Sequence, residues 1–222
     1  MKTITLTIDG QKISARPGEK LLRAALDNGI YIPNLCYIKD KPESSASCRL
    51  CWVEIEGIKE PVTACTVEAA EGMAVNTRGE KSLALARAGF ELIMASHALD
   101  CAHCPANGKC ELQKIAKHLK ASLKTKRFRL LLRELPVDDS NPLFTYDPNK
   151  CVLCGRCIWA CRHDIQSGVF GFAHRGFDRV MTTFADEPIG KDQCLDCHRC
   201  VEVCPTGALT FKDGKKPPGN KA

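Results

Sequence analysis

The chain has 222 residues, with 32 lysines and arginines, 26 aspartates and glutamates and 15 cysteines, so its formal net charge is +6. No apolar run approaches the roughly 18 residues that cross a bilayer, and the N-terminal stretch MKTITLTIDG lacks the apolar segment of a signal peptide. These features and the odd cysteine count argue against a membrane span and against a secreted disulfide framework, so we expect a cytoplasmic protein whose small modules are stabilised by metal.

The start of the chain predicts a β-hairpin followed by a helix. Apolar and polar side chains alternate over residues 2–16, as on a strand with one buried face. Asp9-Gly10 interrupts the alternation, and this pair accepts the positive φ of a tight hairpin turn. Residues 19–28 carry leucine and alanine at helical spacing, with Gly29 placed to end the helix. This order is typical of a β-grasp ferredoxin, and residues 1–77 are predicted to form such a domain.

Four cysteines of this domain have the spacing C-x11-C-x2-C-x13-C and are expected to bind a [2Fe-2S] cluster: Cys36, Cys48, Cys51 and Cys65. The small residues 44–47 allow backbone N–H groups to approach sulfide. The first gap differs from the C-x4-C-x2-C pattern of plant-type ferredoxins, which argues against a photosynthetic-type module. Zinc binding or free thiols are the alternative for these side chains.

A helix is predicted next, over residues 81–96, where apolar side chains recur at helical intervals: Leu83, Leu85, Ala88, Leu92 and Ile93. One imidazole and three thiols follow in the pattern H-x3-C-x2-C-x5-C: His97, Cys101, Cys104 and Cys110. Three cysteines leave a [4Fe-4S] cluster one ligand short, so His97 is the candidate fourth ligand. His103, inside the cysteine pair, competes for this role.

Residues 141–211 are predicted to form a two-cluster ferredoxin domain, because the spacing C-x2-C-x2-C-x3-C occurs there twice. In such a domain the fourth cysteine of each run binds the cluster of the other run. One [4Fe-4S] cluster is therefore expected on Cys151, Cys154, Cys157 and Cys204. The other is expected on Cys161, Cys194, Cys197 and Cys200. Two zinc sites are the alternative, but they leave the third and fourth cysteines of each run without a role.

Residues 78–140 are predicted to hold the helical [4Fe-4S] domain and a basic connector over residues 114–133. The connector is expected to be solvated and partly amphipathic, with docking of an acidic partner subunit as the alternative. Residues 162–193 form an insertion whose phenylalanines are expected to pack around the cluster and the insertion rather than to form a ligand site: Phe170, Phe172, Phe177 and Phe184. The tail, residues 212–222, is rich in lysine, proline and glycine and is predicted to be mobile.

The order of these motifs resembles the small diaphorase iron-sulfur subunit of NAD-reducing [NiFe] hydrogenases over almost the whole chain. It is also similar to the N-terminal iron-sulfur arm of the complex I large iron-sulfur subunit, of related formate dehydrogenases and of multi-cluster [FeFe] hydrogenases. The runs Asp139-Ser140-Asn141-Pro142 and Asp147-Pro148-Asn149-Lys150-Cys151 resemble that family's lead-in to the first ferredoxin motif. The resemblance implies an α+β fold of three modules and assigns the histidine ligand position to His97. Arg162 stands where short ferredoxins carry proline, which leaves that loop geometry open.

No G-x-G-x-x-G, P-loop or H-E-x-x-H motif occurs, so no place for substrate chemistry is visible. We expect an electron-transfer subunit, without flavin or nicotinamide of its own, between a flavoprotein NAD(P)(H)-binding subunit and a catalytic subunit. The resemblance favours a hydrogenase, because complex I relatives often lack the second ferredoxin cluster, and a formate dehydrogenase or electron-bifurcating complex is the alternative. A zinc-stabilised interaction or nucleic-acid-binding protein is a distant alternative. The formal charge of +6 would favour nucleic acid as a partner, but four clusters bound by fifteen thiolates would lower the net charge of the protein to about −1.

Overall fold

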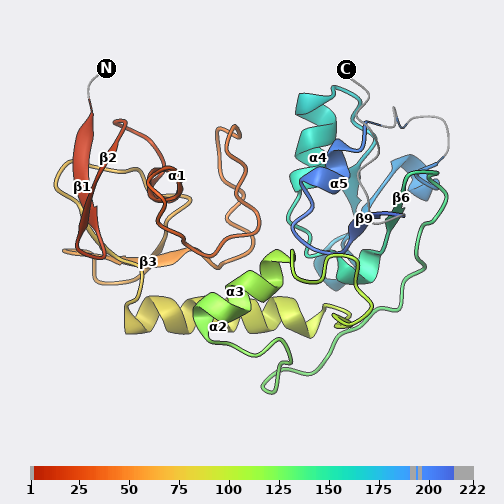
Figure 1. Ribbon diagram of the computed structural model, residues 1–222, viewed down its shortest axis with the longest axis horizontal. Helices are drawn as coiled ribbons and strands as arrows, with labels where there is room; N and C mark the ends of the chain where they lie inside the picture. Colours follow the sequence, from red (N-terminus) through yellow and green to blue (C-terminus); the bar gives the residue numbers. More distant parts are fainter. Residues whose placement is uncertain (1–2, 191–193, 195–196, 213–222) are drawn as a thin grey trace. The chain divides into compact units, whose positions relative to one another are not determined.

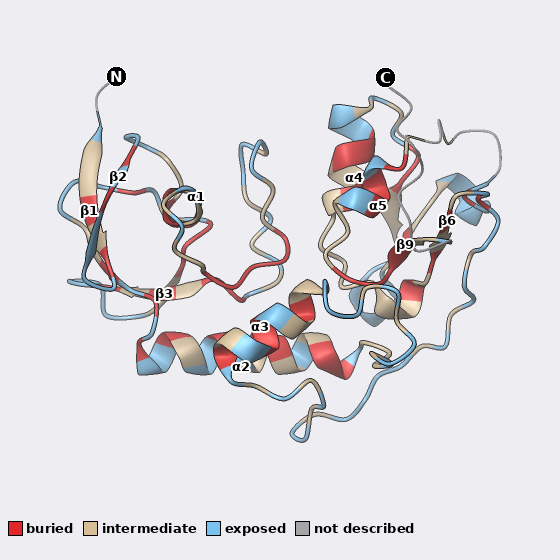
Figure 2. Cartoon of the chain, viewed as in Figure 1, coloured by how far each residue is buried: buried red, intermediate tan, exposed pale blue. Residues whose placement is uncertain are grey.

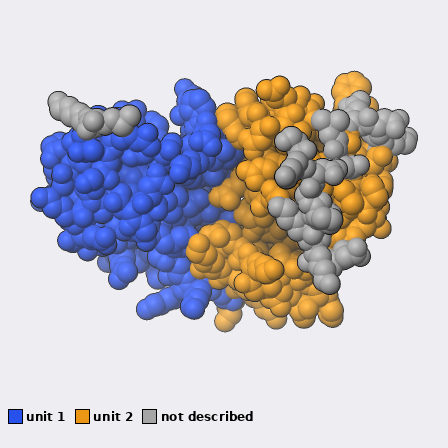
Figure 3. Space-filling model, turned by 45° about the horizontal axis from the view of Figure 1, so that its top comes forward, with its two compact units in different colours: residues 1–93, 115–122 blue, residues 94–114, 123–222 orange. Residues whose placement is uncertain are grey.

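The computed structural model describes residues 3–190, 194 and 197–212. The chain divides into two compact units (Figure 3): unit 1 is residues 1–93 with 115–122, and unit 2 is residues 94–114 with 123–222. The tail predicted to be mobile lies outside the described residues from residue 213 onward. Among the described residues, no helix combines the length and the apolar character that a bilayer crossing requires.

Unit 1 is built on a five-stranded sheet with the strand order β2-β1-β5-β3-β4 (Figure 1). The strands are β1 (Ile4–Ile8), β2 (Gln11–Ala15), β3 (Trp52–Ile55), β4 (Val62–Thr63) and β5 (Ala74–Asn76). Strand β1 pairs antiparallel with β2 and parallel with β5, whereas β3 pairs antiparallel with β4 and β5. The predicted hairpin turn is confirmed, since Asp9 and Gly10 have φ values of 51° and 80°, as a primed turn requires.

Helix α1 (Leu21–Asp27) shares its core with this sheet. Its buried Leu21 and Leu22 belong to the same apolar cluster as Leu6 and Ile8 of β1. The helix begins later than predicted because Lys20 is extended and forms a β-bridge with Glu68. The predicted helix is otherwise confirmed, and its apolar face closes the core of unit 1 (Figure 2).

Helix α2 (Glu80–Ala95) confirms the helix predicted over residues 81–96. Two of the apolar side chains at helical spacing, Leu85 and Leu92, are 40% and 56% exposed. The buried residues of this helix are Ser82, Ala86, Gly89, Phe90, Met94 and Ala95 (Figure 2). At Gly89 the helix backbone approaches the loop before β3 so closely that an added Cβ would lie 2.7 Å from the carbonyl oxygen of Arg49. Because glycine permits this approach, the face around Gly89 turns inward.

Helix α3 (Glu111–Leu119) occupies the first part of the predicted connector. Its apolar side chains Leu112, Ile115 and Leu119 are buried, as on an amphipathic helix. The Nε of Arg87 donates to the carbonyl oxygen of Leu119 at 2.9 Å and so satisfies one of the free carbonyl groups at the helix end. Residues 120–133 contain no helix or strand, in agreement with a connector over this part.

Unit 2 consists of short strands and short helices. Strand β6 (Phe144–Tyr146) pairs antiparallel with β9 (Leu209–Phe211), and β7 (Gly171–Ala173) pairs antiparallel with β8 (Val180–Thr182). The α-helices of this part are α4 (Arg156–Trp159) and α5 (Arg199–Glu202), and a π-helical turn (Ala160–Asp164) continues α4. Buried apolar side chains and cysteines share one core: Phe144, Phe170, Met181, Leu209, Cys157, Cys161 and Cys200.

The insertion between the cysteine runs packs inside only in part. Phe170 is buried and Phe172 packs against the core, but Phe177 and Phe184 are 80% and 81% exposed. The two exposed side chains lie in 3-10 turns, Gly176–Asp178 and Phe184–Asp186, on either side of β8. A two-stranded pair is too small to cover them, so the predicted packing is confirmed for Phe170 and Phe172 and was wrong for Phe177 and Phe184. The mixture of helices and sheets confirms the α+β class, while the three-module division stays a prediction.

Candidate metal centres

The structure brings the four cysteines of unit 1 together as two pairs. Cys36, Cys51 and Cys65 are buried, and Cys48 is half-buried. Hydrogen bonds join the thiols of Cys36 and Cys48 and the thiols of Cys51 and Cys65. The hydrogen bond from Cys48 lowers the pKa of Cys36 to about 5 and raises the pKa of Cys48. In the same way, Cys51 lowers the pKa of Cys65 to about 6 while its own pKa rises. In each pair the hydrogen bond therefore favours the thiolate form of one cysteine over that of the other.

The loop before Cys48 directs backbone N–H groups at sulfur. The amides of Ser47 and Cys48 hydrogen-bond to Cys36 and contribute to its lowered pKa. Ala46 and Arg49 have φ values of 47° and 54°, and left-handed residues among right-handed ones create concave backbone that attracts anions. Two thiol pairs with nearby N–H donors fit a [2Fe-2S] core, whose two irons each take two thiolates.

His97 lies just after α2 and has a buried ring nitrogen without a partner. Its Nδ1 has no hydrogen-bond partner in the described part of the chain, while the imidazole is hydrogen-bonded to the backbone of Lys150. Burial, and after it the charge of Lys150, lowers the pKa of His97 to about 4, so the ring is neutral at pH 7. Metal-binding histidines are neutral and commonly engage a carbonyl group through the other ring nitrogen. His97 therefore fits a ligand role better than His103, which is 84% exposed and pairs with Asp100 at 2.9 Å.

The three cysteines expected to bind with His97 are half-buried: Cys101, Cys104 and Cys110. Burial raises the pKa of Cys110, and the neighbouring Cys104 and Cys101 raise it further. The Sγ of Cys104 packs on the backbone of Gly207 so closely that a Cβ added to Gly207 would clash with it. The glycine thus holds open the space that the Cys104 thiolate occupies. One neutral imidazole and three grouped thiols fit a [4Fe-4S] cluster.

In unit 2 the structure gathers the cysteines of the two C-x2-C-x2-C-x3-C runs into two sets. One enclosed cavity is lined by Cys151, Cys154, Cys157 and Cys204. The other four cysteines gather around Cys200, whose pKa is raised by burial and then by Cys194, Cys197 and Cys161. Each set combines three cysteines of one run with the last cysteine of the other. Both sets fit a [4Fe-4S] cluster, and the ligand assignments themselves stay proposals.

Cys161 lies in the π-helical turn, directly before Arg162. Arg162 has the backbone N–H that proline lacks, so the helix continues past Cys161. The carbonyl oxygen of Cys161 accepts N–H groups from Ser167 and Gly168, and its Sγ accepts the N–H of Val169 at 3.3 Å. The loop geometry that the sequence left open is therefore a widened helical turn with a donor at the sulfur.

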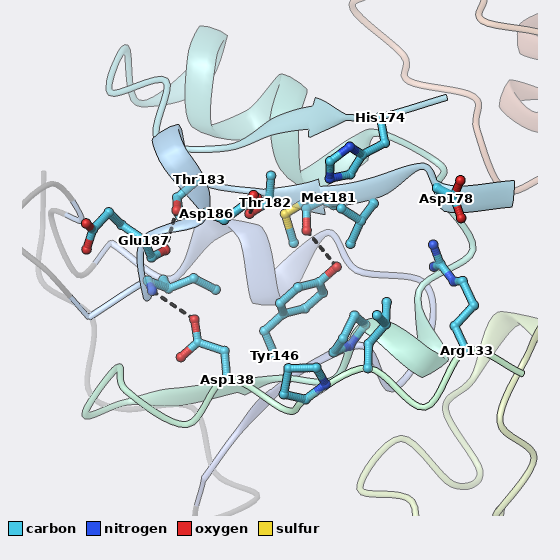
Figure 4. Close-up of a pocket in the computed structure, with 15 residues that line it drawn as sticks. Arg133, Asp138, Tyr146, His174, Asp178, Met181, Thr182, Thr183, Asp186 and Glu187 are labelled. Atoms are coloured by element: carbon cyan, nitrogen blue, oxygen red, sulfur yellow. Dashed lines mark hydrogen bonds between the residues drawn. The ribbon is translucent and has the colours of Figure 1, made fainter. Parts of the chain in front are cut away.

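An open pocket with a volume of about 600 Å³ adjoins the cavity that contains Cys151 (Figure 4). Tyr146 and Met181 line both spaces and form the wall between them. The hydroxyl of Tyr146 donates to the carbonyl oxygen of Met181 at 2.9 Å, and burial raises the pKa of Tyr146. On the rim, the guanidinium of Arg133 donates to the carbonyl oxygens of Phe177 and Arg179.

Sequence patterns did not point to a role of Gly207, Tyr146 or His198 at these sites. Gly207 and Tyr146 act through packing and backbone contacts, which leave no local signal in the sequence. A signal for His198 was present, because alignment of the two cysteine runs places it opposite Gly155. This position is occupied in both runs by a left-handed residue.

Three family models match the chain. A 2Fe-2S iron-sulfur cluster binding domain matches residues 1–80, and an NADH-ubiquinone oxidoreductase-G iron-sulfur binding region matches residues 87–122. A 4Fe-4S dicluster domain matches residues 150–208. These matches confirm the predicted cofactors, a [2Fe-2S] cluster and [4Fe-4S] clusters.

Subunits of several oxidoreductases are similar to this chain in sequence. The alpha subunit of an NADPH-Fe(3+) oxidoreductase from Geobacter sulfurreducens is 34% identical over 212 residues, which cover 96% of this chain and 24% of that protein. The chain thus spans about a quarter of the length of this relative. The NADP-reducing hydrogenase subunit HndD from Solidesulfovibrio fructosivorans is 34% identical over 94% of this chain and 36% of its own length.

Two of the similar proteins align with this chain over nearly the whole length of both aligned chains. The gamma subunit of the NAD-reducing hydrogenase HoxS from Cupriavidus necator is 29% identical over 95% of this chain and 88% of that subunit. A chain in the crystal structure of an NAD+-reducing [NiFe]-hydrogenase in the H2-reduced state superimposes with a TM-score of 0.84 at 30% identity. The superposition covers 97% of this chain and 90% of that chain. The present chain therefore belongs to the family of iron-sulfur subunits that includes the gamma subunit of NAD-reducing hydrogenase.

Proposed function

We propose that this chain is the electron-relay subunit of an NAD(P)-linked hydrogenase complex. It would connect a flavoprotein subunit that binds NAD(P)(H) to the catalytic hydrogenase subunit. Clusters bound at the four ligand sets would accept and pass on single electrons. The chain itself holds these ligands, excludes water from them and keeps neighbouring sets close together.

The observation that carries the proposal is the contact in unit 2 between the segments of two ligand sets. After His97, the amide of Ala98 donates to the carbonyl oxygen of Asn149 at 2.9 Å. Asn149 stands two residues before Cys151. The imidazole of His97 is also hydrogen-bonded to the backbone of Lys150. The two contacts hold His97, a ligand candidate of one set, against the residues that directly precede Cys151 of the other set.

A second contact joins two further segments that carry cysteines of the same two ligand sets. The amide of Glu111, next to Cys110, donates to the carbonyl oxygen of Pro205, next to Cys204, at 2.9 Å. The hydroxyl of Thr206 then donates to the carbonyl oxygen of Lys150 at 2.9 Å. These hydrogen bonds keep the segments of the two ligand sets together. Such proximity favours electron transfer between their clusters, because electron carriers must lie near one another.

The two sets of the ferredoxin domain also adjoin. The pKa of Cys157 is raised by burial and by the cysteines of its own set, and after them by Cys200 of the other set. Burial also lowers the dielectric around both sets and, with N–H donors such as Val169, adjusts the reduction potential of a bound cluster. These contacts support a continuous series of three sets within unit 2.

Metal analysis of the purified full-length chain tests the proposal first. We expect about fourteen iron atoms and matching acid-labile sulfide per chain, from one two-iron and three four-iron clusters. A few zinc ions without sulfide would reject the relay and favour the zinc-stabilised alternative.

Purification of the native complex tests the partners. We expect a flavoprotein and a hydrogenase subunit to co-purify with the chain, and the isolated chain to turn over neither hydrogen nor NADH. Turnover by the isolated chain would contradict the relay. Recovery of a formate dehydrogenase instead would replace the catalytic partner and leave the relay in place.

A further inference from the structure

The two cysteine runs of unit 2 differ at one backbone position that the geometry makes equivalent. Gly155 follows the second cysteine of the first run, and His198 follows the second cysteine of the second run. Both precede an arginine and the third cysteine, and both form the N-terminal boundary of a short helix, α4 or α5. Their φ values are 77° and 47°. A left-handed backbone suits glycine, whereas a histidine there is strained.

The His198 side chain is buried despite this strain. It is 6% exposed, and its ring packs edge-on against Phe211 with 5.8 Å between the ring centroids. Its Nδ1 is buried and has no hydrogen-bond partner among the described residues. A strained residue with a buried, unpaired polar atom is unfavourable in a protein unless another group satisfies that atom.

In the first run the left-handed position lies next to an apolar ring. A Cβ added to Gly155 would lie 3.6 Å from the ring of Phe172. In the second run the left-handed residue itself carries a buried imidazole. The two runs therefore differ in polarity at this position.

We propose that the imidazole of His198 donates a hydrogen bond from Nδ1 to a sulfur of the cluster held by the Cys200 set and thereby raises its reduction potential. The proposal rests on the cluster assignment of the proposed function. His198 stands between Cys197 and Cys200, and anionic sulfur is the acceptor that this ligand set brings to a buried N–H. It is a positioning residue that acts through the cluster.

The direction of the effect follows from charge. One-electron reduction adds negative charge to the cluster, and a hydrogen-bond donor at sulfur stabilises that added charge. The reduced state is therefore favoured, and the potential rises. In the Cys151 set the glycine at the equivalent position supplies no side-chain donor. The cluster of the Cys200 set therefore gains a contribution that raises its reduction potential, and the cluster of the Cys151 set lacks it.

Redox titration of the full-length chain, followed by EPR, tests the proposal. His198→Gly copies the first run, removes the donor and relieves the left-handed strain, so the cluster should still assemble. We expect the potential of one [4Fe-4S] cluster to become more negative while the other three clusters keep theirs. His198→Asn tolerates the left-handed backbone and retains an N–H donor, so its potential should lie between those of wild type and His198→Gly.

A second histidine near this set provides the control. His163 is exposed and stacks on Trp159 with 3.7 Å between the ring centroids, so His163→Ala should leave all four potentials in place. An unchanged potential in His198→Gly would overturn the proposal, and so would loss of the cluster, because the first run assembles with glycine. A wild-type chain without about fourteen irons would instead refute the cluster assignment.

Discussion

The imidazole of His97 is hydrogen-bonded to the backbone of Lys150, the residue that directly precedes Cys151. One hydrogen bond and one peptide link therefore connect a ligand candidate of one set to a ligand candidate of the next. The same contact orients the ring, because a hydrogen bond at one nitrogen leaves the other free to bind metal. This geometry motivates the first prediction.

Replacement of His97 by alanine should remove one [4Fe-4S] EPR signal and leave the other three clusters intact. The reason is that three thiolates remain where four ligands are needed. His103→Ala is the matched control, because His103 is exposed and paired with Asp100, and its spectra should equal those of wild type. Loss of the signal in His103→Ala alone would transfer the ligand role to that residue.

Paired cysteine variants should reveal crosswise ligation through the iron content. Cys151→Ala and Cys204→Ala should each lower the iron content by about four atoms, and the double variant should lose about four as well, because both side chains serve one cluster. Cys151→Ala combined with Cys161→Ala should lose about eight. Ligation within each run would give the opposite result for the two double variants, and iron analysis distinguishes them.

Gly207→Ala should disturb the set of His97 although Gly207 lies 110 residues after His97 in the chain. The added methyl group would clash with the Sγ of Cys104, and such overpacking costs about 1–3 kcal/mol. Weakening of the same EPR signal that His97→Ala removes is the expected result. Gly171→Ala is the control, since its added methyl group meets open space and its φ is ordinary. Equal spectra for the two variants would contradict this packing.

Asp138→Asn should lower the stability of unit 2. Burial alone would raise the pKa of Asp138, but hydrogen bonds from the amides of Ile189 and Ser140 bring it below its ordinary value. A lowered pKa means that the stabilisation is fully present above about pH 4, the unfolded value, and is lost as the pH falls through the folded value. The difference in unfolding free energy between the variant and the wild type should therefore be constant between about pH 5.5 and 8. The lost hydrogen bonds should cost about 1 kcal/mol of stability, so cluster absorbance should be lost about 2–4 °C earlier on heating. A stability difference that vanishes within this pH range would contradict the stabilising role of the Asp138 carboxylate.

Removal of iron and sulfide should affect the two units differently. The core of unit 1 is built mainly from apolar side chains of its sheet and α1, with Cys51 and Cys65 among them. The smaller core of unit 2 contains Cys157, Cys161 and Cys200 and packs against three further candidate ligands, Cys151, Cys194 and Cys204. A small core with so many candidate metal ligands depends on its cofactor. Hydrogen exchange followed by mass spectrometry should show retained protection in β1, β2 and α1 and lost protection in β6 and β9. Uniform loss across both units would refute this difference.

The hairpin, the helices α1 and α2 and the grouping of cysteines were predictable because they depend on local patterns. A hairpin turn at Asp9-Gly10 needs only the conformational freedom of two residues. The spacing of cysteines is likewise local, since two intervening residues bring successive thiols to one side of a tight loop. The buried face of α2 was not predictable in the same way, because it follows from the contact between Gly89 and Arg49, which lie 40 residues apart.

By itself, the sequence determined which cofactors this protein binds, because ligand number and spacing are written in short segments of chain. Tertiary structure alone decided which histidine is buried and neutral, which segments hold two ligand sets together and which phenylalanines remain exposed. These properties depend on desolvation and on contacts between segments far apart in the chain. No pattern along the chain records how deeply a side chain is buried once distant segments pack around it.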